Sequence, residues 1–437
     1  MAAYSELVNE LAPRKFGRSG QLWTGGLVFF TVLGIIAYVD QLVEGQIVTN
    51  MRDYVLWGVY ISNFVFFVAI SFVGSFTAAV LRLSNSQWRT PLVRIAEIIA
   101  FAAIVMAGIT IILDMGRPDR LYNLFIHGRL QSPITWDVII ITTYIAVSIL
   151  ILYLPLLPDL AILKDHFKNK PTLSKIYNML SLNWTGSEKQ RKLQQRSIQI
   201  VAITIIPIAF ILQTIDAWLF STTYRIGWDS TNFGPYFIAG AFVVGTGGLI
   251  SVMYVLRKAY NLEDYITDFH FNKMGKILVL ACLVYLYFNI NEYLIPLFTA
   301  PVDEIKHLNE LFFGEYSSLF YFVNVGGLIL PIIVLLFKGG RKPLPLFIVA
   351  LVVVITSWWK RYLIVVPALL HPFLPVQGVP ESWHHYFPSM HEWAIVSGTL
   401  AMALLIITIL VRYVPIIPIQ RTADEQGILK TEKQERS

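Results

Sequence analysis

Ten long apolar stretches divide this chain of 437 residues, and polar segments separate them. Each stretch approaches or exceeds the roughly 20 apolar residues that a helix needs to cross a bilayer core. Their apolar residues run continuously, whereas a transmembrane β-strand would alternate with a two-residue period. The pattern predicts an all-α, polytopic membrane protein with about ten transmembrane helices, at residues 22–43, 54–81, 92–113, 134–156, 198–219, 235–256, 277–298, 319–337, 345–367 and 391–414.

Composition favours the same class of protein. Hydrophobic residues make up 56% of the chain and charged residues only 14%, against about 25% in soluble domains. The first stretch is too long for a signal peptide, so we expect a retained helix. The single cysteine, Cys282, excludes an intrachain disulfide, an iron–sulfur cluster and a Cys-rich zinc site. Basic residues are spread between the spans, which argues against nucleic acid as a partner.

Lysine and arginine are unequally divided between the two sides that ten alternating helices create. The side with the N-terminus holds 26 of the 34 basic residues, and the other side holds 6. Cytoplasmic segments are enriched in these residues, so both termini are predicted to be cytoplasmic. We expect a cytoplasmic segment at 1–21, a membrane domain at 22–414 and a polar, disordered tail at 415–437. The basic loop 157–197 is expected to lie solvated on anionic headgroups.

Ionisable residues inside a membrane are costly, so each one is a candidate functional group. Most lie near the outer ends of the spans, while Glu97 lies in the cytoplasmic half. The outer set is Asp40, Asp114, Asp137, Asp216, Glu292, Lys360, Arg361 and Glu392. We expect Asp40 and Glu392 to be wetted span-end residues. Asp114 is equally compatible with a pocket carboxylate and with a residue at the end of a helix. At Asp137, a structural role in the helix dipole is the alternative to proton handling.

The deeper charged residues have structural alternatives as well. Asp216 and Glu292 lie in polar stretches of the kind that line a cavity or contact another helix. Glu97 is one helical turn from Arg94, and a local ion pair between them is its structural alternative. Lys360 and Arg361 are expected to pair with an outer carboxylate, in a salt bridge that can be purely architectural.

The eight histidines all lie outside the deep parts of the spans, which excludes haem held by two facing histidines. His127 lies between Asp114 and Asp137 in the sequence. An imidazole there has the right chemistry to accept a proton from a quinol hydroxyl. Trp136 and Trp218 are two of several outer tryptophans, which either form an interfacial belt or wall a flat apolar ligand.

Several local strings are similar to the polysulfide reductase (NrfD) membrane subunit family over nearly the whole chain from the second span onward. They are WGVYISNFVFF, RLSNSQWRTPLVRIAE, LDMGRPDR, SPITWDV, FGPYFIAGAF, SWWKRYLIV and HEWA. The resemblance implies two four-helix bundles, here 54–219 and 235–367, and two peripheral helices. It also implies a quinone site near the outer face, no redox cofactor in the chain, and electron exchange with an extrinsic iron–sulfur protein. Some members couple this reaction to proton movement.

The same resemblance suggests which residues form the site. The family's pocket positions fall on Asp114, His127 and Asp137, and Glu97 and Arg361 lie on matching strings. We expect His127 and Asp137 to serve the quinone oxygens, and Asp114 and Asp216 to pass protons onward. The predicted quinone contacts are Trp136, Arg117, Asp216 and Trp218. The predicted proton path uses Glu97, Glu292, Lys360 and Arg361.

The leading hypothesis is therefore a quinone-binding subunit of a respiratory oxidoreductase complex in the inner membrane of a prokaryote. Menaquinone or another quinone is the expected ligand, with no haem and no iron–sulfur cluster in this chain. Membrane lipid, an outer iron–sulfur protein, and other membrane and cytochrome c subunits are the expected partners, and Arg117 and Arg120 are candidates for docking. Two alternatives stay open, which are an ion-translocating subunit without a redox reaction and a purely structural anchor. Phe72 stands where the alternative complex III branch tends to have histidine, so the sulfur-respiration branch also stays open.

Overall fold

A computed structural model describes residues 2–428 except 85, 87, 224 and 372–377. Within these residues there is no β-strand, and ten helical segments are long and apolar enough to cross a membrane. The prediction of an all-α, ten-helix membrane protein is confirmed. The spans are α2 (Arg18–Glu44), α3 (Val59–Leu83), α4 (Thr90–Asp114), α6 with its continuation α7 (Pro133–His166), α9 (Glu188–Ser221), α10 (Phe233–Tyr260), α11 (Asp268–Thr299), the segment Ser317–Leu336, α15 (Pro343–Leu370) and α16 (Met390–Tyr413).

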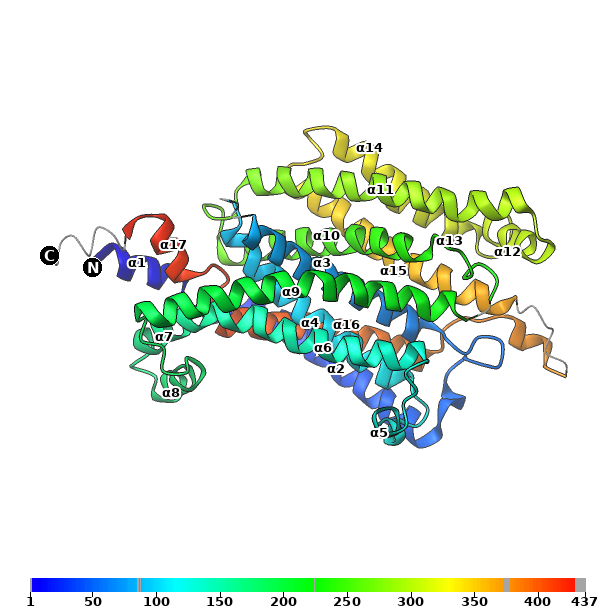
Figure 1. Cartoon of the computed structure of the whole chain (residues 1–437), viewed down its shortest axis with the longest axis horizontal. Coiled ribbons are helices and arrows are strands. Elements are labelled where there is room, and N and C mark those ends of the chain that lie inside the picture. Colours follow the sequence, from blue (N-terminus) through cyan, green and yellow to red (C-terminus); the bar gives the residue numbers. More distant parts are fainter. Residues whose placement is uncertain (1, 85, 87, 224, 372–377, 429–437) are drawn as a thin grey trace.

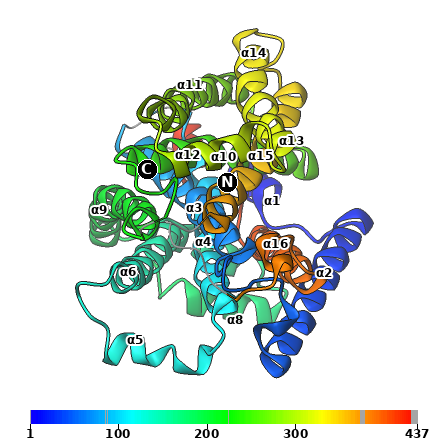
Figure 2. The same ribbon diagram turned by 90° about the vertical axis from the view of Figure 1, so that its right-hand side faces the viewer.

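The spans form two groups of four and one peripheral pair. The first group contains α3, α4, α6 and α9, and the second contains α10, α11, the segment Ser317–Leu336 and α15. Helix α3 joins the groups because it also packs on α10 and α15. Viewed along the helices in Figure 2, α3 and α4 lie near the centre, with α6 and α9 on one side and α2 and α16 on the other.

The peripheral pair is held together by a close backbone crossing. A Cβ atom added at Gly34 of α2 would lie 2.8 Å from the Cα atom of Gly398 of α16. Small residues at such a crossing let two membrane helices approach closely. The amide of Asn63 on α3 donates to Thr399 on α16 at 2.8 Å, which connects this pair to the first group.

The eighth span is irregular in its middle. It consists of α13 (Ser317–Tyr321), a π-helix at Phe322–Ile329 and α14 (Leu330–Leu336). Pro331 has no N–H to donate, and π-turns are rare interruptions that often occur at functional sites. The π-helix contains Asn324, which is buried and bonded to side chains of α11 and α15.

The two ends of the molecule carry different short elements. The end with most of the basic residues, which we call the basic end, carries α1 (Ala2–Leu11), α7 (Leu157–His166), α8 (Pro171–Leu180) and α17 (Ile419–Glu425), at the left of Figure 1. The opposite end, which we call the outer end after its predicted orientation, carries η2 (Pro118–Arg120), α5 (Tyr122–Ile126), α12 (Val302–Phe312) and η5 (Glu381–His384).

The segment 157–197 contains α7, α8 and the start of α9, and most of its residues are exposed, so its predicted place on anionic headgroups stays a prediction. One expectation about the basic end is wrong. The part of the tail at 419–425 is helical rather than disordered, because Ile419 and Ala423 are buried against the bundle. The rest of the disorder prediction, at 429–437, lies outside the described residues.

Candidate functional site

The outer ends of α6, α9 and α15 bring two carboxyl groups and a guanidinium group together inside the protein. Asp137 lies in the first two turns of α6, which begins with Pro133 at a position where its missing N–H costs nothing. Asp216 lies on α9 and is fully buried, and the Asp137 carboxyl is its neighbour. The positive charge that acts on Asp216 comes from Arg361 of α15, which is 2% exposed.

These three residues and Gln213, one turn before Asp216, form what we call the outer cluster. Many of its polar atoms have no hydrogen-bond partner among the described residues. These atoms are Asp137 Oδ1, both Asp216 oxygens, both Gln213 amide atoms, and Arg361 Nε and Nη2. Buried polar atoms are satisfied in more than about 90% of cases, so a group of exceptions calls for a bound ligand, water or proton. Adjacent carboxylates repel each other, so this pair is suited to hold a proton.

The described residues around Arg361 leave space for its guanidinium group but do not form an ion pair with it. The guanidinium lies 5.3 Å from the centre of the Phe237 ring. A Cβ atom at Gly240 would lie 3.0 Å from Arg361 Nη2, so the glycine leaves space for this side chain. Contrary to the sequence-based expectation, neither Arg361 nor Lys360 forms an ion pair with a carboxylate within the described part of the chain.

The two predicted tryptophans lie next to each other at the outer ends of the same helices. The rings of Trp136 and Trp218 meet edge to face with centroids 6.4 Å apart. Trp136 donates its indole N–H to the carbonyl of Leu130, while Trp218 is 46% exposed. The two rings therefore lie within two residues of Asp137 and Asp216 along the chain, and the ring of Trp218 faces the outside of the bundle.

Within the described residues, no hydrogen bond or ion pair joins three other predicted residues to the outer cluster. His127 is exposed just after α5, and Arg117 forms an exposed ion pair of 2.9 Å with Asp119. Asp114 ends α4 with a buried, unpartnered Oδ1 atom, and its acidic neighbour is Glu392 rather than Asp137. The sequence order 114, 127, 137 therefore does not produce one compact triad.

Glu392 is fully buried, so the expectation of a wetted side chain there is wrong. It caps α16 by accepting from the backbone N–H of Ser389 at 2.8 Å, and it also accepts from the N–H of Asn50 at 2.9 Å and from the Tyr386 hydroxyl. These bonds give it a structural role. Asp40 is half exposed and pairs with His391 at 2.7 Å, as a span-end residue would.

A second polar group lies inside the second group of helices, and we call it the lysine network. Lys360 donates to the Tyr293 hydroxyl at 2.6 Å and to Asn324 Oδ1 at 3.3 Å. Asn289 donates to the same Asn324 oxygen at 2.9 Å and accepts from Tyr236 at 3.2 Å. Neither Tyr293 nor Asn324 is among the residues predicted from the sequence, although an asparagine within the apolar run FVNVGGLI is a visible signal.

Glu292 lies beside this network at the outer end of α11. Its carboxylate accepts from the Ser230 hydroxyl at 3.1 Å and from the Asn232 amide at 3.3 Å. A small outer cavity of about 60 Å³ adjoins it, and the lining includes Tyr236, Tyr293 and His307.

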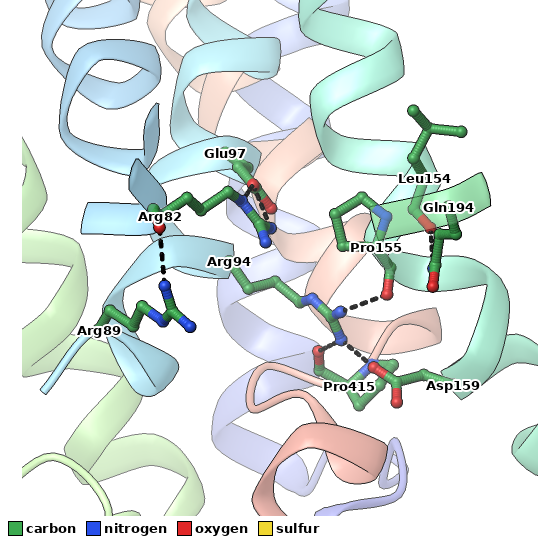
Figure 3. Close-up of polar contacts among 9 residues, drawn as sticks. All are labelled: Arg82, Arg89, Arg94, Glu97, Leu154, Pro155, Asp159, Gln194 and Pro415. Atoms are coloured by element: carbon green, nitrogen blue, oxygen red, sulfur yellow. Dashed lines mark hydrogen bonds and ion pairs between the residues drawn. The ribbon is translucent and has the colours of Figure 1, made fainter. Parts of the chain in front are cut away.

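At the basic end, Glu97 pairs with Arg82 of α3 at 2.6 Å, as Figure 3 shows. The expected local pair with Arg94 is wrong. Arg94 instead pairs with Asp159 at 2.5 Å and donates to the carbonyls of Pro155 and Pro415 at 3.2 Å. It therefore joins α4 to the segments that precede α7 and α17.

Hydroxyl groups occupy the middle of the first group of helices, between the outer cluster and Glu97. Tyr144 of α6 donates to the carbonyl of Ser71 on α3 at 2.8 Å, and the Ser71 hydroxyl lies 3.4 Å away. The hydroxyls of Ser75 and Ser148 also adjoin the Tyr144 hydroxyl. Asp137, Tyr144 and Ser148 follow one another along one buried face of α6.

Comparison with known proteins gives the family. The family model described as polysulphide reductase, NrfD, matches residues 47–372. The chain belongs to the NrfD family. The matched residues contain both groups of four helices and leave out the α2 and α16 pair.

Three curated relatives are matched over nearly their full length. A Halobacterium salinarum protein provisionally named as a membrane subunit of dimethyl sulfoxide reductase is 26% identical, with 94% of each chain covered. A selenate reductase subunit of Mesobacillus selenatarsenatis is 23% identical over 90% of this NrfD-family chain and 94% of its own. The integral membrane subunit of menaquinone reductase from Nitratidesulfovibrio vulgaris is 25% identical over 91% and 92%. The family and these names together indicate a membrane subunit of a reductase complex.

Proposed function

We propose that this NrfD-family chain is the quinone-reactive membrane subunit of a respiratory reductase complex. It exchanges electrons between a membrane quinone, menaquinone in the first instance, and an iron–sulfur protein docked on the outer face. The proposed location is a prokaryotic cell membrane, with both termini in the cytoplasm. The family match and the menaquinone reductase relative support this function.

The outer cluster is the observation that carries the proposal. A quinone has a flat apolar ring with two polar oxygens, so its site needs an apolar wall and a few placed polar groups. Trp136 and Trp218 offer the wall, and Asp137, Asp216 and Arg361 offer buried polar atoms that lack partners among the described residues. The residues present therefore fit a quinone better than they fit a satisfied protein core.

The proposed chemistry assigns a task to each side chain. Oxidation of a quinol releases two electrons, which leave to the iron–sulfur partner, and two protons. Asp137 accepts a proton and shares it with Asp216, while Arg361 stabilises the negative charge that returns when the proton leaves. His127 serves the other quinol oxygen from the exposed side, and Asp114 passes a proton outward. Arg117 and Arg120, exposed beyond α4, contact the partner protein, and cytochrome c or other membrane subunits complete the complex.

The replacement Asp137→Asn tests this function in the purified complex. General acid–base groups contribute about 10²- to 10⁴-fold to rate, so we expect quinol turnover to fall at least about 100-fold. Asp40→Asn is the matched control, because Asp40 is a carboxylate at the same end that lies outside the cluster. Bound quinone is measured by extraction in parallel. Undiminished turnover in Asp137→Asn would remove Asp137 from the mechanism, and absence of quinone from the wild-type complex would contradict the function itself.

Proton translocation is a second candidate function, favoured by the hydroxyl groups around Tyr144. They lie between the carboxyl pair at the outer end and Glu97 at the basic end. We propose that protons move along this row during quinone turnover, and that Glu97 and Arg82 form its inner gate. The predicted proton-path role of Arg361 belongs to the same proposal, whereas the hydrogen bonds of Lys360 and Glu292 in the second group of helices favour a structural role for these two residues. Liposomes containing the complex would acidify or alkalise their lumen during turnover if this is correct, and only scalar protons would appear if it is not.

A further inference from the structure

The basic end contains a cavity of about 810 Å³ that the proposed redox function does not use. Its walls come from the junction of α3 and α4, the start of α7 with the residues before it, the first turns of α9, and α17. Ligand sites in proteins commonly measure about 300–1,000 Å³. The cavity is therefore large enough for a small organic ligand or a lipid headgroup.

The polar lining of this cavity is rich in guanidinium groups. Five arginines contribute to it, namely Arg82, Arg89, Arg94, Arg191 and Arg421. Three of them are neutralised locally, because Arg82 pairs with Glu97, Arg94 with Asp159 and Arg421 with Glu425.

Arg89 and Arg191 differ from the other three. Neither forms an ion pair with a carboxylate in the portion of the chain that is described, and the Arg191 Nε atom is buried without a hydrogen-bond partner. Arg89 donates to the carbonyl of Arg82 at 2.7 Å (Figure 3). Burial, and then the nearby charges of Arg421 and Arg82, lower the pKa of Arg89, and the carboxylate of Glu425 acts in the opposite direction. Two arginines that line one cavity without a carboxylate partner among the described residues favour an anion there.

The cavity also has an apolar side that continues onto the surface of the bundle. Its lining includes Leu83, Ile198, Ala202 and Ile203. Leu83 is 42% exposed and Ile203 is 60% exposed, and both belong to helices that span the membrane. The arginines at the end of the span can therefore face a lipid headgroup, and the exposed apolar side chains next to them can face its acyl chain.

We propose that this cavity binds an anionic phospholipid, with the phosphodiester between Arg89 and Arg191 and an acyl chain along α9 at Ile203. Basic pockets between transmembrane helices on the cytoplasmic side are suited to acidic headgroups. The predicted orientation places this site in the cytoplasmic leaflet. Lipid binding there does not depend on the quinone reaction. A free phosphate ion would satisfy the arginines but would leave the apolar side without a ligand.

The test compares phosphatidylglycerol, phosphatidylcholine with the same acyl chains, and inorganic phosphate as additives to the full chain purified in detergent. We expect phosphatidylglycerol to raise the thermal unfolding midpoint more than phosphatidylcholine does. Each basic residue near a lipid surface contributes about 1 kcal/mol, and the double variant Arg89→Gln/Arg191→Gln removes two of them. Half of this effect should therefore require about 30-fold more phosphatidylglycerol in the double variant. Native mass spectrometry should show one bound anionic lipid in the wild type and its loss in the variant.

The control is Lys189→Gln/Lys192→Gln, which removes two exposed charges from the same stretch of α9 outside the cavity lining. This variant should behave like the wild type, and Arg89→Lys/Arg191→Lys should recover most of the effect. If the double variant fails to fold, Arg191→Glu provides the same test, because Arg191 lies half-buried in the first turns of α9. An unchanged lipid response in the variants, or equal stabilisation by phosphatidylcholine, would overturn the proposal. The same shift with inorganic phosphate alone would assign the cavity to a soluble anion instead.

Discussion

Lys360 and Arg361 are neighbours in the sequence and are both buried. Their side chains nevertheless belong to two different polar groups, the lysine network and the outer cluster. Lys360 points into the second group of helices, where Tyr293 and Asn324 accept its hydrogen bonds. Arg361 lies against Phe237 and Gly240 of α10, its charge acts on Asp216 of the first group, and two of its nitrogen atoms have no partner among the described residues. The lysine network is closed on itself, whereas the outer cluster is left open.

This difference separates a structural polar group from a reactive one. A buried network in which each member has its bonds makes one packing arrangement more favourable than others. A buried cluster without those bonds costs free energy that only a ligand or a proton can offset. The comparison therefore predicts that mutations in the two regions affect different measured quantities.

The largest effect is expected at Arg361. Replacing it with Gln removes the positive charge that acts on Asp216, and loss of one electrostatic stabiliser costs about 10²- to 10³-fold in rate. We expect quinol turnover by the complex to fall by about 100-fold or more, while Arg361→Lys retains part of it. Lys360→Gln on the same helix is the matched control and should keep turnover within about threefold. Equal losses at 360 and 361 would erase the distinction between the two regions.

A stability effect is expected when the lysine network is broken. Asn324→Leu leaves Lys360 and Asn289 without the oxygen that both use, and an unsatisfied buried partner costs about 1–3 kcal/mol. The free energy of unfolding should fall by about that amount, with turnover of the folded complex unchanged. Asn291→Leu is the control and should have little effect, because among the described residues the Asn291 amide donates to the Tyr287 carbonyl of its own helix. A loss of turnover in Asn324→Leu without lower stability would show that the lysine network takes part in the reaction.

A pH effect is expected at the outer mouth of the second group of helices. Burial, and then the charge of His371, lower the pKa of His307 to about 3, below its usual 6.5. As pH falls, the unfolded chain therefore binds a proton at His307 at a higher pH than the folded chain does. The stability that comes from the neutral imidazole is fully present above about pH 6.5 and is lost as pH falls toward 3. Between pH 6.5 and 5 we expect a loss of roughly 1–2 kcal/mol that His307→Phe removes.

The variant must be compared with the wild type at each pH, because a nearby carboxyl acts in the opposite direction. Burial and Asp229 raise the pKa of Glu304 on the same helix α12. His385→Gln, at an exposed histidine, is the control. Parallel pH curves for wild type and His307→Phe would show that this imidazole does not titrate with unfolding.

The smallest effect on rate is expected at Tyr144. Tyr144→Phe removes the hydroxyl that adjoins Ser71, Ser75 and Ser148, but it leaves the outer cluster intact. Quinol turnover should stay within about threefold, while the number of protons moved per electron falls in liposomes. Tyr153→Phe, whose hydroxyl contacts Leu180 near the basic end, is the control. Unchanged proton yield in Tyr144→Phe would argue against this row as a path.

Apolar length and charge position were enough to predict the helices and the enrichment of charged residues at their outer ends. Side-chain partners were harder, because they depend on which way each residue faces around its helix. Consecutive residues on a helix point about 100° apart, which explains why Lys360 and Arg361 do not share a partner. The same geometry allows Arg82, on another helix, to reach Glu97 while Arg94 reaches Asp159. Sequence spacing suggested an ion-pair partner close along the chain, whereas in the structure the partners come from neighbouring helices.

The crossing at Gly34 and Gly398 has a consequence for how the chain is made. Eight spans of the described chain separate α2 from its neighbour α16, so α2 leaves the ribosome well before α16 does. Only 17% of the apolar window of α2 is buried even in the finished molecule, so until α16 arrives it stands in lipid with almost no protein contacts. A chain that stops before α16 therefore leaves Gly34 of α2 facing lipid without the helix that packs on it.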